Sequence, residues 1–170
     1  DATIITTKFG DIQIDESDAI ILRSVVTHDG GITVDAAGQM IVTSVDASSA
    51  NHGANTVTLT TTVGDLSVVS INAGNQNDVV LTATSGFITE DGSAAVEVIA
   101  DSLTATAGGP LTLDTQVNSA IITTTEIGAV DLQETDSITL ANIVTQEGDI
   151  SVEAGNGISV VAITAGNDGD

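Results

Sequence analysis

The residues of this chain best suited to bind a ligand are acidic and amide side chains in turn-like segments. Carboxylate, amide and turn carbonyl oxygens are the ligands that calcium takes, about six to eight at a time. Asp15 and Asp35 hold equivalent places in two blocks twenty residues apart, and two glycine-containing turns add further oxygen donors. The sequence therefore predicts calcium-binding positions at Asp15, Asp35, Asn75, Asn77, Asp78, Asn167, Asp168 and Asp170.

An ordinary Asn/Asp/Gly turn with solvated charges fits the same segments. They lack the nine-residue period of the glycine-aspartate repeats in calcium-loaded solenoids, and they contain no helix-loop-helix calcium motif. Stacked acids such as Asp15 and Asp35 would nevertheless benefit from a cation, because two unit charges about 4.8 Å apart repel by about 0.9 kcal/mol even in water. Other acids, among them Glu134 and Asp136, are expected in turns or pointing outward.

Transition-metal and nucleophilic chemistry have little support in the sequence. The chain has two histidines, His28 and His52, and no cysteine, so a third placed ligand is missing. No Gly-x-Ser-x-Gly elbow occurs. We expect both histidines at the surface.

A polysaccharide-acting enzyme is a third reading, because some parallel β-helices are lyases or hydrolases. Lyase chemistry needs a basic residue beside a bound cation, and Lys8 and Arg23 are the only lysine or arginine residues. Sugar clefts usually offer aromatic platforms, but Phe9 and Phe87 are the only aromatics. We expect both phenylalanines to pack in the core or at an end, and we predict no enzymatic activity.

Threonine recurs in Thr-x-Thr pairs, for example Thr58 with Thr60 and Thr104 with Thr106. Threonine favours a half-buried pleated surface and pairs with its copy on the next strand, which explains these columns. A flat, exposed array of stacked hydroxyls would instead order water and suit an ice-binding surface. The sequence leaves that alternative open.

A twenty-residue repeat predicts the elements that position these side chains. Blocks that begin at Gly10, Gly30, Gly128 and Gly148 carry apolar residues at six matching places. Within each block the apolar residues form pairs separated by one residue, and each pair marks a short strand with alternate side chains pointing inward. Extra residues are expected between Ala47 and Val63, where the repeat loses its phase.

Three short strands per block, stacked in parallel on the next block, predict an all-β fold of the parallel β-helix (β-solenoid) type. We expect rungs of about 20–22 residues and a right-handed coil. A tandem array of Ig-like β-sandwiches is the alternative, although a sandwich needs about one hundred residues and antiparallel pairing. Residues 1–170 are expected to form a single solenoid segment of a longer array or filament.

The composition limits the partners of such a rod. The formal net charge of −22 disfavours nucleic acid and anionic membranes. No apolar run approaches the length of a membrane span, so direct membrane insertion is not predicted. The expected partners are neighbouring copies or repeats of the chain and, in an adhesin, a cell-surface or carbohydrate ligand.

Several stretches, once read as stacked strands, are similar to a known group of proteins. Residues 101–109, 111–117, 132–140 and 148–155 resemble the very large bacterial exoproteins built from β-strand repeats, which are related in style to filamentous haemagglutinin and autotransporter adhesins. The likeness covers most of the chain. It implies a β-helical filament or stalk that is extracellular or on the cell surface, with a calcium-dependent adhesin or binding module as the alternative. Head-to-tail assembly is expected, because neither end of the sequence shows a polar cap.

Overall fold

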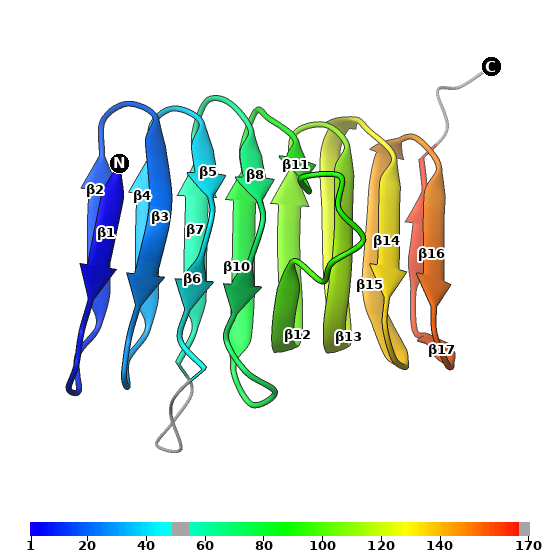
Figure 1. Cartoon of the computed structure of the whole chain (residues 1–170). Helices are drawn as coiled ribbons and strands as arrows, with labels where there is room; N and C mark the ends of the chain where they lie inside the picture. Colours follow the sequence, from blue (N-terminus) through cyan, green and yellow to red (C-terminus); the bar gives the residue numbers. More distant parts are fainter. Residues whose placement is uncertain (49–54, 167–170) are drawn as a thin grey trace.

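The computed structural model describes residues 1–48 and 55–166, which form strands and no helix. Every strand pairing among them is parallel, and successive passes of the chain stack as about eight turns of a β-solenoid (Figure 1). The predicted parallel β-helix is confirmed. Tandem sandwiches are excluded, because a sandwich requires antiparallel neighbours.

Three ladders of stacked strands build the solenoid. The first ladder contains β2 (Ile12–Glu16), β4 (Ile32–Ala36), β7 (Val57–Thr61), β10 (Asp78–Ala83), the second part of β12 (Val98–Ala107), the last part of β13 (Leu111–Ile127), β15 (Ile138–Glu147), β17 (Ile158–Val160) and β18 (Ile163–Ala165).

The second ladder contains the first part of β3 (Ile20–Val26), β5 (Met40–Val42), β8 (Leu66–Val68), β11 (Ile88–Thr89), the first part of β13, β14 (Val130–Glu134) and β16 (Ile150–Ala154). The third ladder contains β1 (Ala2–Ile5), the second part of β3, β6 (Val45–Asp46), β9 (Ile71–Asn72), the first part of β12, the middle of β13 and the last residues of β14 and β16. Where the corner between two ladders is tight, a single strand continues around it and contributes to both ladders.

Alternation of side chains along each strand fills a continuous core. In β7, Val57 and Leu59 point inward and are fully buried, while Thr58 between them is half-buried on the outside. Like side chains stack on like from rung to rung, as Ile12 does on Ile32. Each strand is too short to be stable alone, so parallel stacking supplies both the apolar contacts and the backbone partners.

Buried threonines close many of the corners. The hydroxyls of Thr27, Thr61 and Thr145 each donate to a glycine carbonyl three residues further on, at 2.8, 3.0 and 2.9 Å. These threonines are almost completely buried at inward-facing positions near strand ends. The hydroxyl satisfies a turn carbonyl that would otherwise lie against the core.

Rungs touch at the turns, and this contact requires glycine at Gly86. A Cβ atom at Gly86 would lie 2.1 Å from the carbonyl oxygen of Gly64 on the preceding rung. The two backbones are therefore closer than any other residue type permits.

Some rungs have the expected 20–22 residues, as from Ile12 to Ile32 and from Val57 to Val79, but others are longer or shorter. Ile32 pairs with Val57, 25 positions later, whereas Leu103 pairs with Ala120, 17 positions later. The extra residues predicted between Ala47 and Val63 are thus present. Corners absorb the differences, because ladder pairing fixes the strands and leaves the turn lengths free.

The matching places of the early and late blocks do not lie on the same ladder. Ile12 and Ile32 lie in the first ladder, but Val130 and Ile150, at the same places in their blocks, lie in the second. Blocks that look alike therefore start on different faces. The unequal rungs between them shift the pattern by one strand, which local similarity does not reveal.

The two phenylalanines do not lie in the core. Phe9 is 77% exposed and Phe87 is 46% exposed. The Phe87 ring lies over Gly109 of the next rung, where a Cβ would meet its Cε1 atom at 2.4 Å. The inward columns are filled by aliphatic side chains, which stack on themselves in a narrow solenoid. No described segment folds into an apolar helix of membrane-spanning length.

Candidate functional site

The segment between β11 and β12 is longer than the other connections between the second and the third ladder. On the other described rungs one or two residues separate the second ladder from the third, as between Leu113 and Thr115 or between Val68 and Ile71. Here residues 90–97 intervene before Val98, and Figure 1 shows this coil crossing the strands that follow it. We call residues 90–97 the acidic loop, because both its ends are glutamates.

Glu97, at the end of the acidic loop, is completely buried. Its Oε2 atom accepts a hydrogen bond from the backbone amide of Asp114 at 2.8 Å. Its own amide donates to the Asp114 carbonyl at 2.9 Å, and its carbonyl accepts from Ile71 at 2.6 Å. Backbone pairing with both neighbouring rungs therefore holds Glu97 in place.

Two further carboxyl groups face the Glu97 carboxyl. Glu90 and Asp114 are half-buried, and one oxygen from each of the three residues lies within 4.8 Å of the others. Among the described residues, Glu90 Oε2 and Glu97 Oε1 are buried and have no hydrogen-bond partner. The fold thus gathers three acids and leaves two of their oxygens unsatisfied.

The protonation of this cluster is strongly perturbed. Burial raises the pKa of Glu97 from its ordinary value of 4.5 to about 7; the Asp114 amide opposes the shift, and the charges of Asp114, Glu90 and Asp91 add to it. Burial raises the pKa of Glu90, with the charge of Asp114 adding to it. Burial and the charge of Asp131 raise the pKa of Asp114. Such a cluster can hold a proton or a cation at neutral pH.

A second buried carboxylate, Glu134, has a different environment. It was expected in a turn or pointing outward, but it is 4% exposed and occupies an inward column of the third ladder. Oε2 accepts from the Val117 amide at 2.9 Å and the Thr115 hydroxyl at 3.0 Å, while Oε1 accepts from the Asp136 amide at 2.9 Å. These donors satisfy both carboxylate oxygens of Glu134, which therefore has a structural role.

The predicted calcium positions in the first turns are only partly brought together. Asp15 stacks directly on Asp35, as expected, and both are exposed. The next residue in that column is Thr60. Within residues 1–48 and 55–166 a cluster of three acids with converging oxygens forms at Glu90, Glu97 and Asp114 and not at Asp15. Calcium at Asp15 and Asp35 stays a prediction.

The turn at Asn75, Asn77 and Asp78 uses two of its side chains to link rungs. Buried Asn77 accepts from the Asn55 amide at 2.9 Å and donates to the Ala73 carbonyl at 2.6 Å. Asp78 accepts from the Ser102 hydroxyl at 2.6 Å, and Asn75 is exposed. Asn167, Asp168 and Asp170 lie outside the described residues, as does His52.

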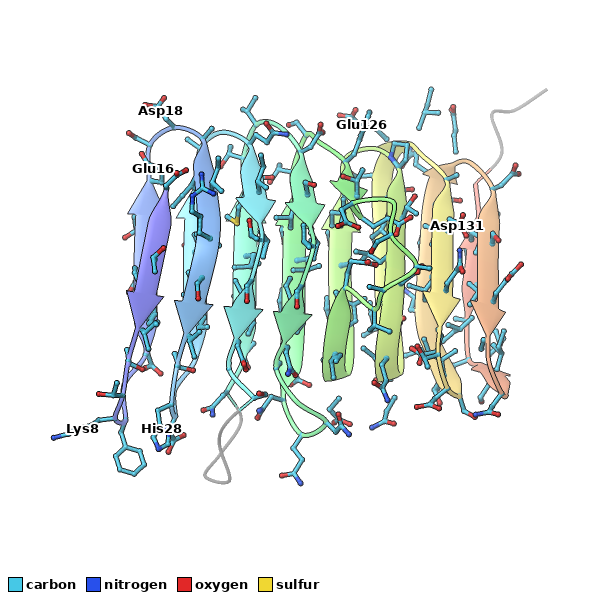
Figure 2. All side chains as sticks on the ribbon, viewed as in Figure 1. Lys8, Glu16, Asp18, His28, Glu126 and Asp131 are labelled. Carbon is cyan, nitrogen blue, oxygen red and sulfur yellow. The ribbon has the colours of Figure 1, made fainter. Side chains whose placement is uncertain are left out.

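The few positive charges lie at the start of the solenoid. Arg23 Nε forms an ion pair with Asp1 Oδ2 at 2.9 Å, and both side chains are largely exposed. Figure 2 shows Lys8 and His28 at one rim, and Glu16, Asp18 and Glu126 along the opposite rim. The acidic loop lies several rungs away from Lys8 and Arg23.

Threonines line part of the outer surface of the first ladder. One outward column holds, on consecutive rungs, the half-buried residues Thr60, Thr82, Thr106 and Thr123. The adjacent column is mixed and holds Thr58, Val80, Thr104 and Ile121. The hydroxyls are thus stacked in one column, and ice binding stays a prediction.

One feature of the sequence marks the start of the acidic loop. Glu90 follows Ile88 by two residues, the spacing at which Val68 follows Leu66 and Leu113 follows Leu111. An acid at a place that is apolar on the neighbouring rungs marks either a break in the strand or a polar group drawn inward.

No family model, curated protein or solved structure matches the chain.

Proposed function

We propose that this chain is a structural rod that forms an extracellular or cell-surface filament or stalk, by stacking solenoid on solenoid. The fold and its likeness in style to β-strand-repeat exoproteins support this role. The solenoid stacks about eight turns in one direction, and its acidic surface keeps such a rod soluble.

One observation carries the proposal: the last described rung leaves its inward side chains uncovered. Val160 and Ile163 stack on buried Leu140 and Ile143, yet they are 56% and 43% exposed. The strands of this rung pair on one side with β14 and β15. Open backbone edges beside exposed apolar columns are the surface that another rung covers.

The partner surface lies at the other end of the solenoid. Among the strands of the described ranges, β1 pairs only with β3 and β2 only with β4, so each has one edge free of these strands. Because all strands run parallel, joining the last rung of one copy to the first rung of the next keeps the same direction. That contact is heterologous and produces an open filament.

Light scattering after gel filtration and negative-stain microscopy over a range of concentrations test the assembly. We expect molar mass to rise with concentration and rods to lengthen in steps of one solenoid. Val160→Asp should abolish this growth, because it places a charge on the contact surface. Ser159→Asp, on the outward face of the same strand, is the matched control. Wild-type protein that stays monomeric at every concentration would refute the assembly.

A calcium-dependent adhesin or binding module is the second candidate, and the carboxyl cluster at the acidic loop favours it. In that role the ion stiffens the rod, and a lateral face binds a cell-surface or carbohydrate ligand. Melting curves measured with calcium and with a chelator separate a calcium-dependent rod from a calcium-independent one.

A further inference from the structure

We propose that Glu90, Glu97 and Asp114 bind one divalent cation, calcium in preference to magnesium, and that the ion fastens the acidic loop to the strand beneath it. This site shares no residue with the sequence-predicted calcium positions. It does not depend on filament assembly.

The spacing of the carboxyl oxygens suits an ion between them. Calcium binds oxygens at about 2.3–2.6 Å, so two ligands on opposite sides of it are separated by about 5 Å. The three acids bring one oxygen each to within 4.8 Å of the others. A central calcium can therefore contact all three without moving a strand.

Burial of Glu97 is an independent reason to expect a ligand. Its side chain is completely buried, and no described residue offers a partner to its Oε1 atom. An ionised carboxylate removed from water is costly unless a charge or a set of donors compensates it. Glu134 shows the compensated alternative, because three donors surround its carboxylate.

Neither the one lysine nor the one arginine of the chain lies beside this cluster. The chain's lysine and arginine total is two, and Arg23 already pairs with Asp1 near the start of the solenoid. Lys8 lies at a rim of the first turns (Figure 2). With no lysine or arginine beside the cluster, we expect its charge to be neutralised from solution, by a proton or by a metal ion.

The donor set selects the kind of ion. Three carboxylates without histidine or cysteine favour hard cations over transition metals. Magnesium demands near-ideal octahedral geometry and retains water, whereas calcium accepts irregular carboxylate ligands. Glu90 and Glu97 come from the two ends of a loop and Asp114 from β13, an arrangement that suits the more tolerant ion.

Titration calorimetry and far-UV circular dichroism melts of the 170-residue chain at pH 7.5 test the site, with calcium chloride, magnesium chloride or EDTA. We expect one calcium per chain, with weaker magnesium binding. The melting temperature should rise by about 5 °C or more once free calcium exceeds the Kd a hundredfold.

Glu97→Gln should lower calcium affinity by about 100-fold or more and remove the calcium-induced rise in melting temperature. In EDTA it should melt above the wild type, because the amide carries no buried charge. Asp114→Asn should weaken binding in the same direction and serves if Glu97→Gln fails to fold. Asp35→Asn removes one exposed acid and should leave the calcium response intact.

Four results would overturn the proposal. A calcium response that survives both Glu97→Gln and Asp114→Asn would place the ion elsewhere, and one abolished by Asp35→Asn would place it at the stacked acids of the first turns. Equal responses to magnesium and calcium would refute the calcium preference. No response of the wild type to either ion would mean that a proton alone neutralises the cluster.

Discussion

Glu97 and Asp114 are joined by two reciprocal hydrogen bonds: the Asp114 amide donates to Glu97 Oε2 at 2.8 Å, and the Glu97 amide donates to the Asp114 carbonyl at 2.9 Å. The bonds tie the end of the acidic loop to β13 and fix a carboxyl group inside the protein. They leave Glu97 Oε1 without a partner among the described residues. The stability of the rung that contains Glu97 should therefore depend on proton and cation concentration.

The first prediction concerns pH in the absence of divalent ions. The folded-state pKa of Glu97, about 7, exceeds its ordinary value of 4.5, so between these values the folded protein binds more protons than the unfolded chain. The contribution of Glu97 to stability is then greatest below about pH 4.5 and is lost as the pH rises through 7. The full difference corresponds to roughly 3 kcal/mol.

Urea denaturation followed by far-UV circular dichroism in EDTA measures this effect, since the chain has no tryptophan or tyrosine to report by fluorescence. Other acids also titrate, so the informative quantity is the difference in unfolding free energy between wild type and Glu97→Gln. This difference should shift in favour of the variant between pH 5 and pH 8. A constant difference would show that Glu97 titrates normally.

The second prediction concerns the satisfied carboxylate, Glu134. Glu134→Ala removes the acceptor of two backbone amides and one hydroxyl, which should lower the unfolding free energy by roughly 3 kcal/mol. Glu153→Ala is a suitable control, because Glu153 is an exposed acid on the next rung and should change stability by less than about 0.5 kcal/mol. Equal effects of the two variants would contradict the assignment of Glu134 as a structural group.

The third prediction compares the middle of the core with the last described rung. Leu81→Ala should cost about 2–5 kcal/mol, because Leu81 is fully buried between Leu59 and Ala105 in the first ladder. Val160→Ala should cost much less in the dissociated chain, because Val160 is already 56% exposed. Denaturation at a concentration below assembly measures both. Similar costs would mean that the last rung is covered in solution.

The fourth prediction tests the close contact between turns. Gly86→Ala should destabilise the fold by more than about 3 kcal/mol, since its Cβ would overlap the carbonyl of Gly64 and force two rungs apart. At Gly157 the nearest atom to an added Cβ is Ser137 Oγ at 3.7 Å, so Gly157→Ala should be nearly neutral. Thermal melts of both variants decide the matter. An unaffected Gly86→Ala would show that the turns separate easily.

The fold class followed from the sequence because its cause is local and repeated. Alternation at places such as Ile12 and Ile14 defines a strand with one inward face, and repetition twenty residues later defines what stacks on it. The stacking of Asp15 on Asp35 followed from the same arithmetic. Where neighbouring rungs have equal length, counting residues is enough.

The sequence did not reveal the ladder to which each later strand belongs, because that assignment depends on the summed length of all the rungs before the strand. The rung from Leu103 to Ala120 is short and the acidic loop is long, so Val130 lies on a different face from Ile12. The same uncertainty concealed the carboxyl cluster. Its members come from three separate places in the sequence, and no motif links them.

The sequence by itself determined that this chain is a stack of parallel strands with an aliphatic core and an acidic surface, since periodic burial and net charge are properties of composition and spacing. Only the tertiary structure decided which acids lose contact with water. Burial depends on what covers a side chain, and at Glu97 the cover consists of a loop and strands from other rungs. Glu134 and Asp136 lie two residues apart in the sequence, yet the first is buried and the second is exposed.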